Sequence, residues 1–272
     1  MANELQVRYS NIVDAKLRAE LIFKNGITCN NKFEGSPKAG AVKIPVRDTE
    51  AVVGTYDKAN GGSLNATNTT YLTVTMDTDL YVNELIDGYD AAAVPDNIVA
   101  DRLDSAGYSL ALAFQAKAFE ELEANATKAK STTATTKETA YANLVEARTA
   151  LSVEKVPTNG RVAIVNPDYY GKLLLDSNFI KQSDLSQEMV KAGAVGMCAG
   201  FLIFEGVGMD AKTEFIAYHP NWFTEVEEWA VPVHVQDLSA SGKYIGASAV
   251  QGRKVMKYKL TKPTAAYIKQ TA

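Results

Sequence analysis

One long stretch, from Pro95 to about Ala126, constrains the fold more than any other part of the chain. Its apolar residues recur in steps of three and four, the period of an amphipathic α-helix, at Val99, Leu103, Ala106, Leu110, Phe114, Ala118 and Leu122. Pro95 suits the start of the helix, and Asp96 puts a carboxylate near the positive end of its dipole. Gly107 weakens the helix by about 1 kcal/mol relative to alanine. At about 1.5 Å per residue the helix measures roughly 45 Å, so it needs an extended apolar partner surface, from this chain or from other copies.

The bulk composition is that of an ordinary soluble globular protein, with 46% hydrophobic and 22% charged residues. A chain of 272 residues can form one large domain or two small ones. The net charge of −4 argues against a basic surface that wraps nucleic acid, although a protein that merely encloses nucleic acid needs no such surface. We find no apolar run of membrane-spanning length and no signal-peptide core at the start, so we expect a protein made in a cytoplasm.

The first 82 residues predict an arm and a long two-stranded excursion. Apolar residues between Ile12 and Ile22 indicate a modest helix ended by Asn25 and Gly26. Alternation over 42–46 and 72–76 predicts two paired strands, with Pro45 confining the first to an edge or bulge. The connection between them has too few large apolar residues for a core of its own, and a lone ribbon is marginally stable in water. It is either a flexible surface loop or an arm that becomes ordered on a neighbouring subunit.

After the long helix, the chain indicates a mixed α+β domain. Residues 128–139 are rich in Ser, Thr, Lys and Ala and predict a loop, and 139–157 repeat the helical period. Residues 161–166 predict a buried strand, followed by a short helix that Asn166 caps and Pro167 begins. Further short strands are predicted at 201–204, 214–220, 229–237, 244–250 and 254–260.

Catalytic and metal-binding patterns are missing from the sequence. The two histidines, His219 and His234, lie outside any Cys/His/Asp cluster with metal-ligand spacing. Cys29 and Cys198 are far apart and are expected to be small buried apolar residues in a reducing compartment. The carboxylates that flank Trp222 and Trp229 (Glu225, Glu227 and Glu228) fit a solvated strand or turn. We therefore predict no catalytic, metal or cofactor-binding residues, no cofactor, and no enzymatic activity.

The order of these parts resembles the major capsid proteins of tailed bacteriophages, whose fold is shared with herpesvirus capsid floors and encapsulins. The most specific local similarity is RVAIVNPDYYGKLLLDSNFIKQSDLSQEMVKAGAVGMCAGFLIFEG, where a strand ends in Asn-Pro, a helix follows, and a small-residue turn leads to a second strand. The stretch TVTMDTDLYVNELIDGYDAAAVPDNIVADRLDSAGYSLALAFQ resembles the end of the family's extended loop and its spine helix. The resemblance spans about residues 30 to 265.

This resemblance implies an α+β fold with five parts. They are an N-terminal arm (1–37), an extended two-stranded loop (38–82), a long spine helix (95–127), a peripheral domain (83–136 and 226–272) and an axial domain (137–225). It also implies self-assembly as hexamers and pentamers into an icosahedral shell that encloses double-stranded DNA without sequence-specific binding. The expected location is the virion, after assembly in the host bacterial cytoplasm, with no membrane contact.

The resemblance further implies a scaffolding protein and a portal as partners. No long charged helical segment precedes the arm, so we expect separate scaffolding, or none, and an N-terminus that is not trimmed. Charged residues of the extended loop are expected to contact neighbouring subunits, namely Arg47, Asp48, Glu50, Lys58 and Asp77. Two alternatives stay open: an encapsulin-type nanocompartment shell, and a cytosolic α+β enzyme with an unrecognised site, which predicts a small oligomer and a ligand pocket.

Overall fold

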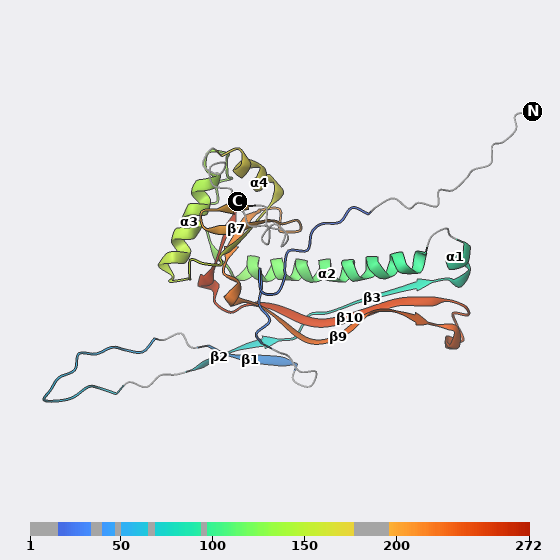
Figure 1. Cartoon of the computed structure of the whole chain (residues 1–272), viewed down its shortest axis with the longest axis horizontal. Helices are drawn as coiled ribbons and strands as arrows, with labels where there is room; N and C mark the ends of the chain where they lie inside the picture. The colour runs from blue at the N-terminus through green and yellow to red at the C-terminus, as the bar shows by residue number, and fades with distance from the viewer. Residues whose placement is uncertain (1–15, 34–39, 47–49, 65–68, 94–96, 177–195) are drawn as a thin grey trace, which may run out of the picture.

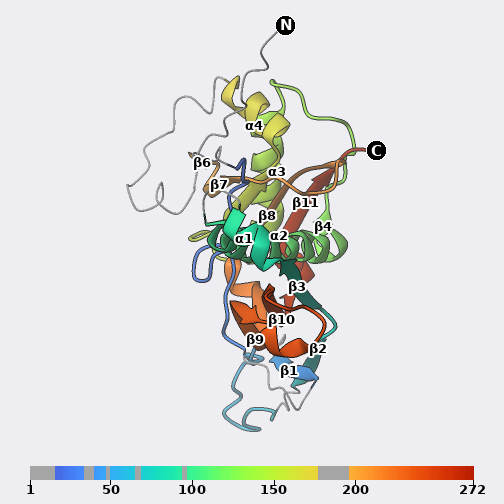
Figure 2. The same cartoon turned by 90° about the vertical axis from the view of Figure 1, so that its right-hand side faces the viewer.

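The computed structural model describes residues 16–33, 40–46, 50–64, 69–93, 97–176 and 196–272. Within these ranges the chain forms a six-stranded sheet covered by helices, an elongated three-stranded sheet beneath a long helix, and a two-stranded ribbon that extends away (Figure 1). Figure 2 shows these parts stacked, with helices α3 and α4 at one end, the ribbon at the other, and α2 between the two larger sheets.

Helix α2 (Ile98–Asn125) confirms the predicted long helix and supplies the axis of the molecule. Its first turn is capped by Asn97, whose side-chain oxygen accepts from the backbone N of Ala100 at 3.3 Å, while Pro95 and Asp96 lie outside the described residues. The N-terminal half packs on the three-stranded sheet through Ile98, Val99, Leu103 and Ala106. The C-terminal half packs on the six-stranded sheet through Phe114, Ala118, Phe119 and Leu122. One helix thus joins both sheets, and its extended apolar partner surface comes from its own chain.

The three-stranded sheet has β10 (Ser248–Leu260) between two antiparallel neighbours, β3 (Asp79–Ile86) and β9 (Phe223–Asp237). Residues 254–260 are strand as predicted, but they continue without a break from Ser248, so the strand predicted at 244–250 begins only at Ser248 and is not a separate element. Its register with β9 shifts between Gln251 and Arg253, which leaves a bulge at Pro232 and Val233. Gly252 allows the two strands to approach closely at this bulge, since a Cβ there would lie 2.7 Å from Cγ2 of Val233.

The six-stranded sheet forms the centre of a three-layer sandwich. Its order is β4 (Thr127–Lys128), β11 (Ala266–Gln270), β8 (Thr213–Tyr218), β5 (Val162–Val165), β7 (Phe201–Glu205) and β6 (Gly196–Cys198). Val162, Ile164 and Ile216 face α2, while Ala163, Phe215 and their neighbours face α3 (Ala140–Val153) and α4 (Pro167–Leu174). The predicted buried strand at 161–166 and its Asn166-capped helix are confirmed, because Asn166 Oδ1 accepts from Tyr169 N at 2.6 Å.

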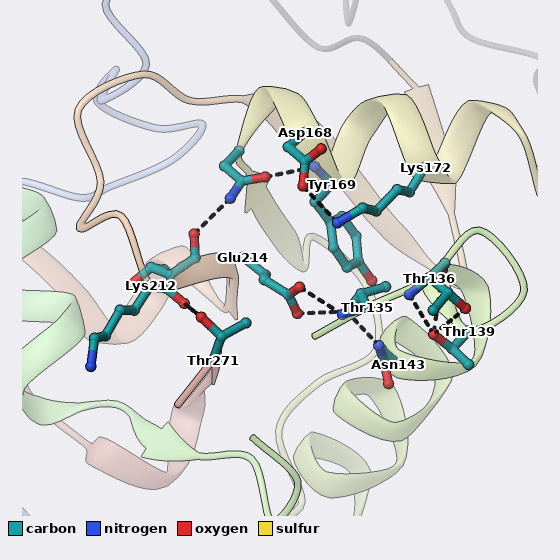
Figure 3. A network of polar contacts seen from close by, with 12 residues as sticks. Thr135, Thr136, Thr139, Asn143, Asp168, Tyr169, Lys172, Lys212, Glu214 and Thr271 are labelled. Atoms are coloured by element: carbon teal, nitrogen blue, oxygen red, sulfur yellow. Dashed lines mark hydrogen bonds and ion pairs between the residues drawn. The ribbon is translucent and has the colours of Figure 1, made fainter. Parts of the chain in front are cut away.

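Buried polar groups hold the loop and the helix ends beside this sheet. The Glu214 carboxylate accepts hydrogen bonds from the backbone N of Thr135 at 2.8 Å and from the Thr135 hydroxyl at 2.5 Å. The Asn143 side chain donates to the same hydroxyl at 2.8 Å (Figure 3). This network ties Thr135, in the loop predicted at 128–139, to β8 and α3. Arg161, which is 2% exposed, closes the C-terminal end of α3 by donating to the carbonyls of Arg148, Val156 and Pro157 at 2.7–3.1 Å.

The helix predicted between Ile12 and Ile22 is wrong where the structure describes it, while Ile12 and Val13 lie outside the described residues. Residues 16–22 run along α2 without helical structure (Figure 1), and two of their backbone groups bond to α2 side chains: Ala19 O accepts from Tyr108 OH, and Ile22 N donates to Gln115. Asn25 and Gly26 do form a turn, in which Cys29 N donates to Lys24 O at 3.3 Å.

The short segment before α2 holds β3 and then helix α1 (Gly88–Ala93), which the sequence did not reveal as separate elements. The domain limits given above stay a prediction. Strand β11, assigned there to the peripheral domain, pairs with β8 in the six-stranded sheet, and β9 crosses the proposed limit at 225/226.

Gly107→Ala is expected to raise the free energy of unfolding by about 0.5–1 kcal/mol and the melting temperature by about 2–4 °C. The reason is that Gly107 lies in the middle of α2 and an added Cβ meets no atom within 4 Å. Thermal unfolding of the unassembled subunit, followed by circular dichroism, measures the change.

Gly206→Ala is the matched control, because its Cβ would lie 2.5 Å from Ile164 Cγ2 and 3.1 Å from Ile22 Cδ1. It should lower the melting temperature. A lower melting temperature for Gly107→Ala would contradict the open space described at the middle of α2.

Candidate assembly surfaces

The ribbon consists of β1 (Ala41–Val46), β2 (Thr70–Thr75) and the segment between them. Its two strands pair as predicted, and their antiparallel register puts Ile44 opposite Leu72 and Val42 opposite Val74. Ile44 and Val74 are each 2% exposed and pack on Val226 of β9, with Phe33 beside them. The ribbon is therefore anchored at its base by a small core of its own subunit.

The described part of the connection, residues 50–64, is here called the ribbon tip, and it extends well beyond the rest of the subunit (Figure 1). A turn closed by Asp57 and Gly61 lies within it. Its large apolar side chains are almost fully exposed: Val52 at 72%, Val53 at 94%, Tyr56 at 72% and Leu64 at 101%. Four such side chains in one segment form an exposed apolar surface, a feature that is typical of interaction sites.

The five charged residues predicted for subunit contacts are not gathered at one place. Arg47 and Asp48 lie outside the described residues, and Glu50 and Lys58 are exposed on the ribbon tip. Asp77 lies at the ribbon base, where both of its carboxylate oxygens accept from Lys257 Nζ of β10, at 2.7 and 3.0 Å. This bond and the lysine charge lower the pKa of Asp77. Asp77 thus ties the ribbon to its own sheet, and contacts with a neighbour stay a prediction for all five.

A second exposed surface is the face of the three-stranded sheet that points away from α2, here called the open face. It holds a shallow depression of about 570 Å³ whose walls include Tyr81, Trp229 and Arg253. Tyr81 is 72% exposed and Trp229 is 40% exposed. The Arg253 guanidinium lies 5.3 Å from the Trp229 ring centroid and donates to Asp79, with Nε to Oδ1 at 2.8 Å.

Sequence reasoning missed the open face, although a signal for it exists. In β3 both sets of alternating positions carry apolar residues: Leu80, Val82 and Ile86 point toward α2, while Tyr81 and Leu85 are exposed. A strand that is apolar on both faces, in a sheet covered by a helix on one side, indicates a second covering partner.

The residues weighed for catalysis have structural roles. Cys29 and Cys198 are fully buried, and burial raises the pKa of each thiol to about 12. His219 Nδ1 accepts from Asn221 N at 3.2 Å and Nε2 lies 3.0 Å from Asn159 O, so the neutral ring is held by the backbone and burial lowers its pKa. On β9, Glu227 pairs with Lys254 at 2.8 Å.

Metal-ligand clusters and membrane-spanning helices are absent from the described ranges. Those residues contain no group of three or more His, Cys, Asp or Glu side chains placed to hold a metal ion. None of the helices within them is both long and apolar enough to cross a membrane.

The ribbon tip and the open face are thus two exposed surfaces with large apolar side chains. A family model described as "Phage capsid protein" matches residues 89–271, which is more than half of the sequence. The chain belongs to this phage capsid protein family, and it is a structural protein of a capsid shell.

Solved structures show the same fold. A structure from Mycobacterium phage Che8 matches with a TM-score of 0.78 and 20% identity, over 98% of this chain and 97% of that one. The capsid of the cyanophage P-SCSP1u matches with a TM-score of 0.79 and 13% identity, over 98% and 93%. The capsid of an empty GTA particle matches with a TM-score of 0.69 and 14% identity, over 98% and 95%. A search of curated proteins finds no match. The predicted tailed-phage major capsid fold is thus confirmed.

Lys257→Met is expected to raise the pKa of Asp77 toward its ordinary value of 3.8, because the variant removes the hydrogen bond and the charge that lower it. A carboxyl with a lowered folded-state pKa adds stability above its unfolded pKa and loses it as the pH falls through the folded value. Wild-type subunits should therefore lose this ribbon anchor only in acid. A carboxyl chemical-shift titration of Asp77 in unassembled subunits measures the shift.

Asp57 is the matched control on the same ribbon. Its pKa is lowered by Ala59 N and the Asn60 side chain, so Lys257→Met should leave it unchanged. The same Asp77 pKa in wild type and variant would show that Lys257 does not hold the ribbon base.

Proposed function

We propose that this protein assembles with itself, as hexamers and pentamers, into an icosahedral shell that encloses double-stranded DNA. The observation that carries the proposal is the ribbon tip, whose apolar side chains have no core in their own subunit. Membership of the phage capsid protein family supports it. Contacts between different patches of identical subunits close into rings, and rings of this kind build shells.

We place the ribbon tip on the open face of a neighbouring subunit. The tip extends away from its own three-stranded sheet (Figure 1). The part of the open face around Tyr81 and Trp229 therefore stays exposed in its own subunit, although the ribbon base packs on the same face at Val226. Apolar side chains of the tip (Val52, Val53, Tyr56 and Leu64) would meet the aromatic walls of the depression (Tyr81 and Trp229). Arg47, Asp48, Glu50 and Lys58 would then make the polar rim of this contact, with Asp77 at the base.

A role in the shell also implies where the protein is located, which partners it has and how it meets DNA. The location is the virion, and assembly takes place in the host bacterial cytoplasm with a portal and a separate scaffolding protein as partners. The net charge of −4 suits a lining that encloses DNA without binding it tightly or sequence-specifically. The protein has no catalytic activity in this proposal.

Replacing residues 50–68 with a short Gly-Ser turn should leave a folded subunit that forms no shells, because the turn removes the covering arm and leaves both sheets intact. Electron microscopy of the purified variant beside wild type, each with scaffold supplied, measures assembly, and circular dichroism checks folding.

A second variant, V52S/V53S/Y56S, keeps the loop length and removes only the apolar side chains of the tip. It should assemble at least about tenfold less efficiently, since three buried apolar contacts per subunit are lost. Shells of normal diameter and yield from both variants would refute the role given to the ribbon.

A further inference from the structure

The segment from Lys16 to Asn30 is here called the strap. Its first part, residues 16–22, follows a single stripe of α2 in the same direction as the helix (Figure 1). Lys16 Nζ lies 2.6 Å from Asp101, and Arg18 lies 2.5 Å from Asp104. Further along, Tyr108 OH donates to Ala19 O at 3.1 Å, and Ile22 N donates to Gln115 Oε1 at 2.7 Å. The strap thus contacts α2 at four successive places.

The register of these contacts is set by elementary geometry. From Asp101 to Gln115 the helix advances 14 residues, or about 21 Å at 1.5 Å per residue. From Lys16 to Ile22 an extended chain advances six residues, or about 20 Å. The four α2 residues recur at steps of three, four and seven, which places them on one side of the helix. A fully extended strap therefore fits this stripe without slack.

The inner half of the strap, residues 22–30, is built into the core. Ile22 is 3% exposed and Cys29 is fully buried. Tyr218 OH donates to Thr28 O at 2.8 Å, and Asn30 Nδ2 donates to Pro220 O at 2.6 Å. These bonds join uncharged groups, the first fully and the second partly buried, so salt has little effect on them.

The outer half, residues 16–20, is held at the surface by two ion pairs, by the partly buried bond from Tyr108 OH to Ala19 O, and by the Arg18 guanidinium 4.9 Å from the Tyr108 ring centroid. Its ion pairs are exposed, with side-chain exposures of 36% and 44% for Lys16 and Asp101, and 30% and 65% for Arg18 and Asp104. Leu17 between them is fully exposed, so it adds no packing. Exposed ion pairs add little to stability. Salt also screens their attraction, since the Debye length falls to about 3 Å at 1 M salt.

We infer that the outer half of the strap is a salt-releasable latch on an acidic stripe of α2, while the inner half is a fixed anchor. Opening the latch removes no residue from the core, so the chain before Ile22 can change direction without unfolding the subunit. A latch of this kind lets identical subunits direct their N-terminal arms to differently placed neighbours. The inference does not depend on the shell geometry proposed above.

A nitroxide label on Leu17→Cys tests the latch in the full-length protein. The native cysteines are fully buried, so the label reacts at the new site. The mobile fraction of the electron paramagnetic resonance spectrum should rise about fivefold between about 50 mM and 1 M NaCl. In D101N/D104N the label should be mobile already at low salt.

Two controls separate a latch from general loosening. A label on Asn31→Cys, an exposed position just beyond the anchor, should keep the same mobility in both salts and in D101N/D104N. The variant D168N/E138Q removes two exposed acidic partners elsewhere, of Lys172 and Lys137, and should leave the label at position 17 unchanged. A label at position 17 that stays immobile in 1 M NaCl and in D101N/D104N overturns the inference, as does equal release at both positions.

Discussion

The burial of helix α2 on two sheets at once is the interaction on which the rest of the subunit depends. Its N-terminal half covers the three-stranded sheet, and its C-terminal half covers one face of the six-stranded sheet. A helix of 28 residues could not persist alone in water with such an apolar stripe exposed. Because both sheets share one rigid helix, their relative position is fixed, and the strap anchored beside Gln115 adds a third element to the same axis.

What α2 leaves uncovered explains why this fold suits a shell. The six-stranded sheet is buried on both faces, by α2 on one side and by α3 and α4 on the other. The three-stranded sheet is covered by α2 on one face; its other face meets the ribbon base at Val226 but is exposed at Tyr81 and Trp229, and the apolar side chains of the ribbon tip are exposed too. A monomer therefore bears the cost of ordering an arm and exposing aromatic side chains, and neighbouring copies offset that cost in an assembly.

Local patterns in the sequence predicted much of this fold. The long helix, the paired ribbon strands, and the strand that leads to Asn166 all depend on residue periods or caps within a few residues. The strap was missed because its partners, such as Tyr108 and Gln115, lie about 90 residues away. The open face was missed because Tyr81, Trp229 and Arg253 come together only through strand register. The charged contact residues depend on a second copy of the chain, which a single sequence does not place.

A side-chain-resolution cryo-electron microscopy map of the assembled particle tests the central claim most directly. We predict density for the ribbon tip of a neighbouring subunit against Tyr81, Trp229 and Arg253 of the open face. An assembled shell in which the open face stays exposed to solvent, or in which the ribbon tip folds back on its own subunit, would contradict it.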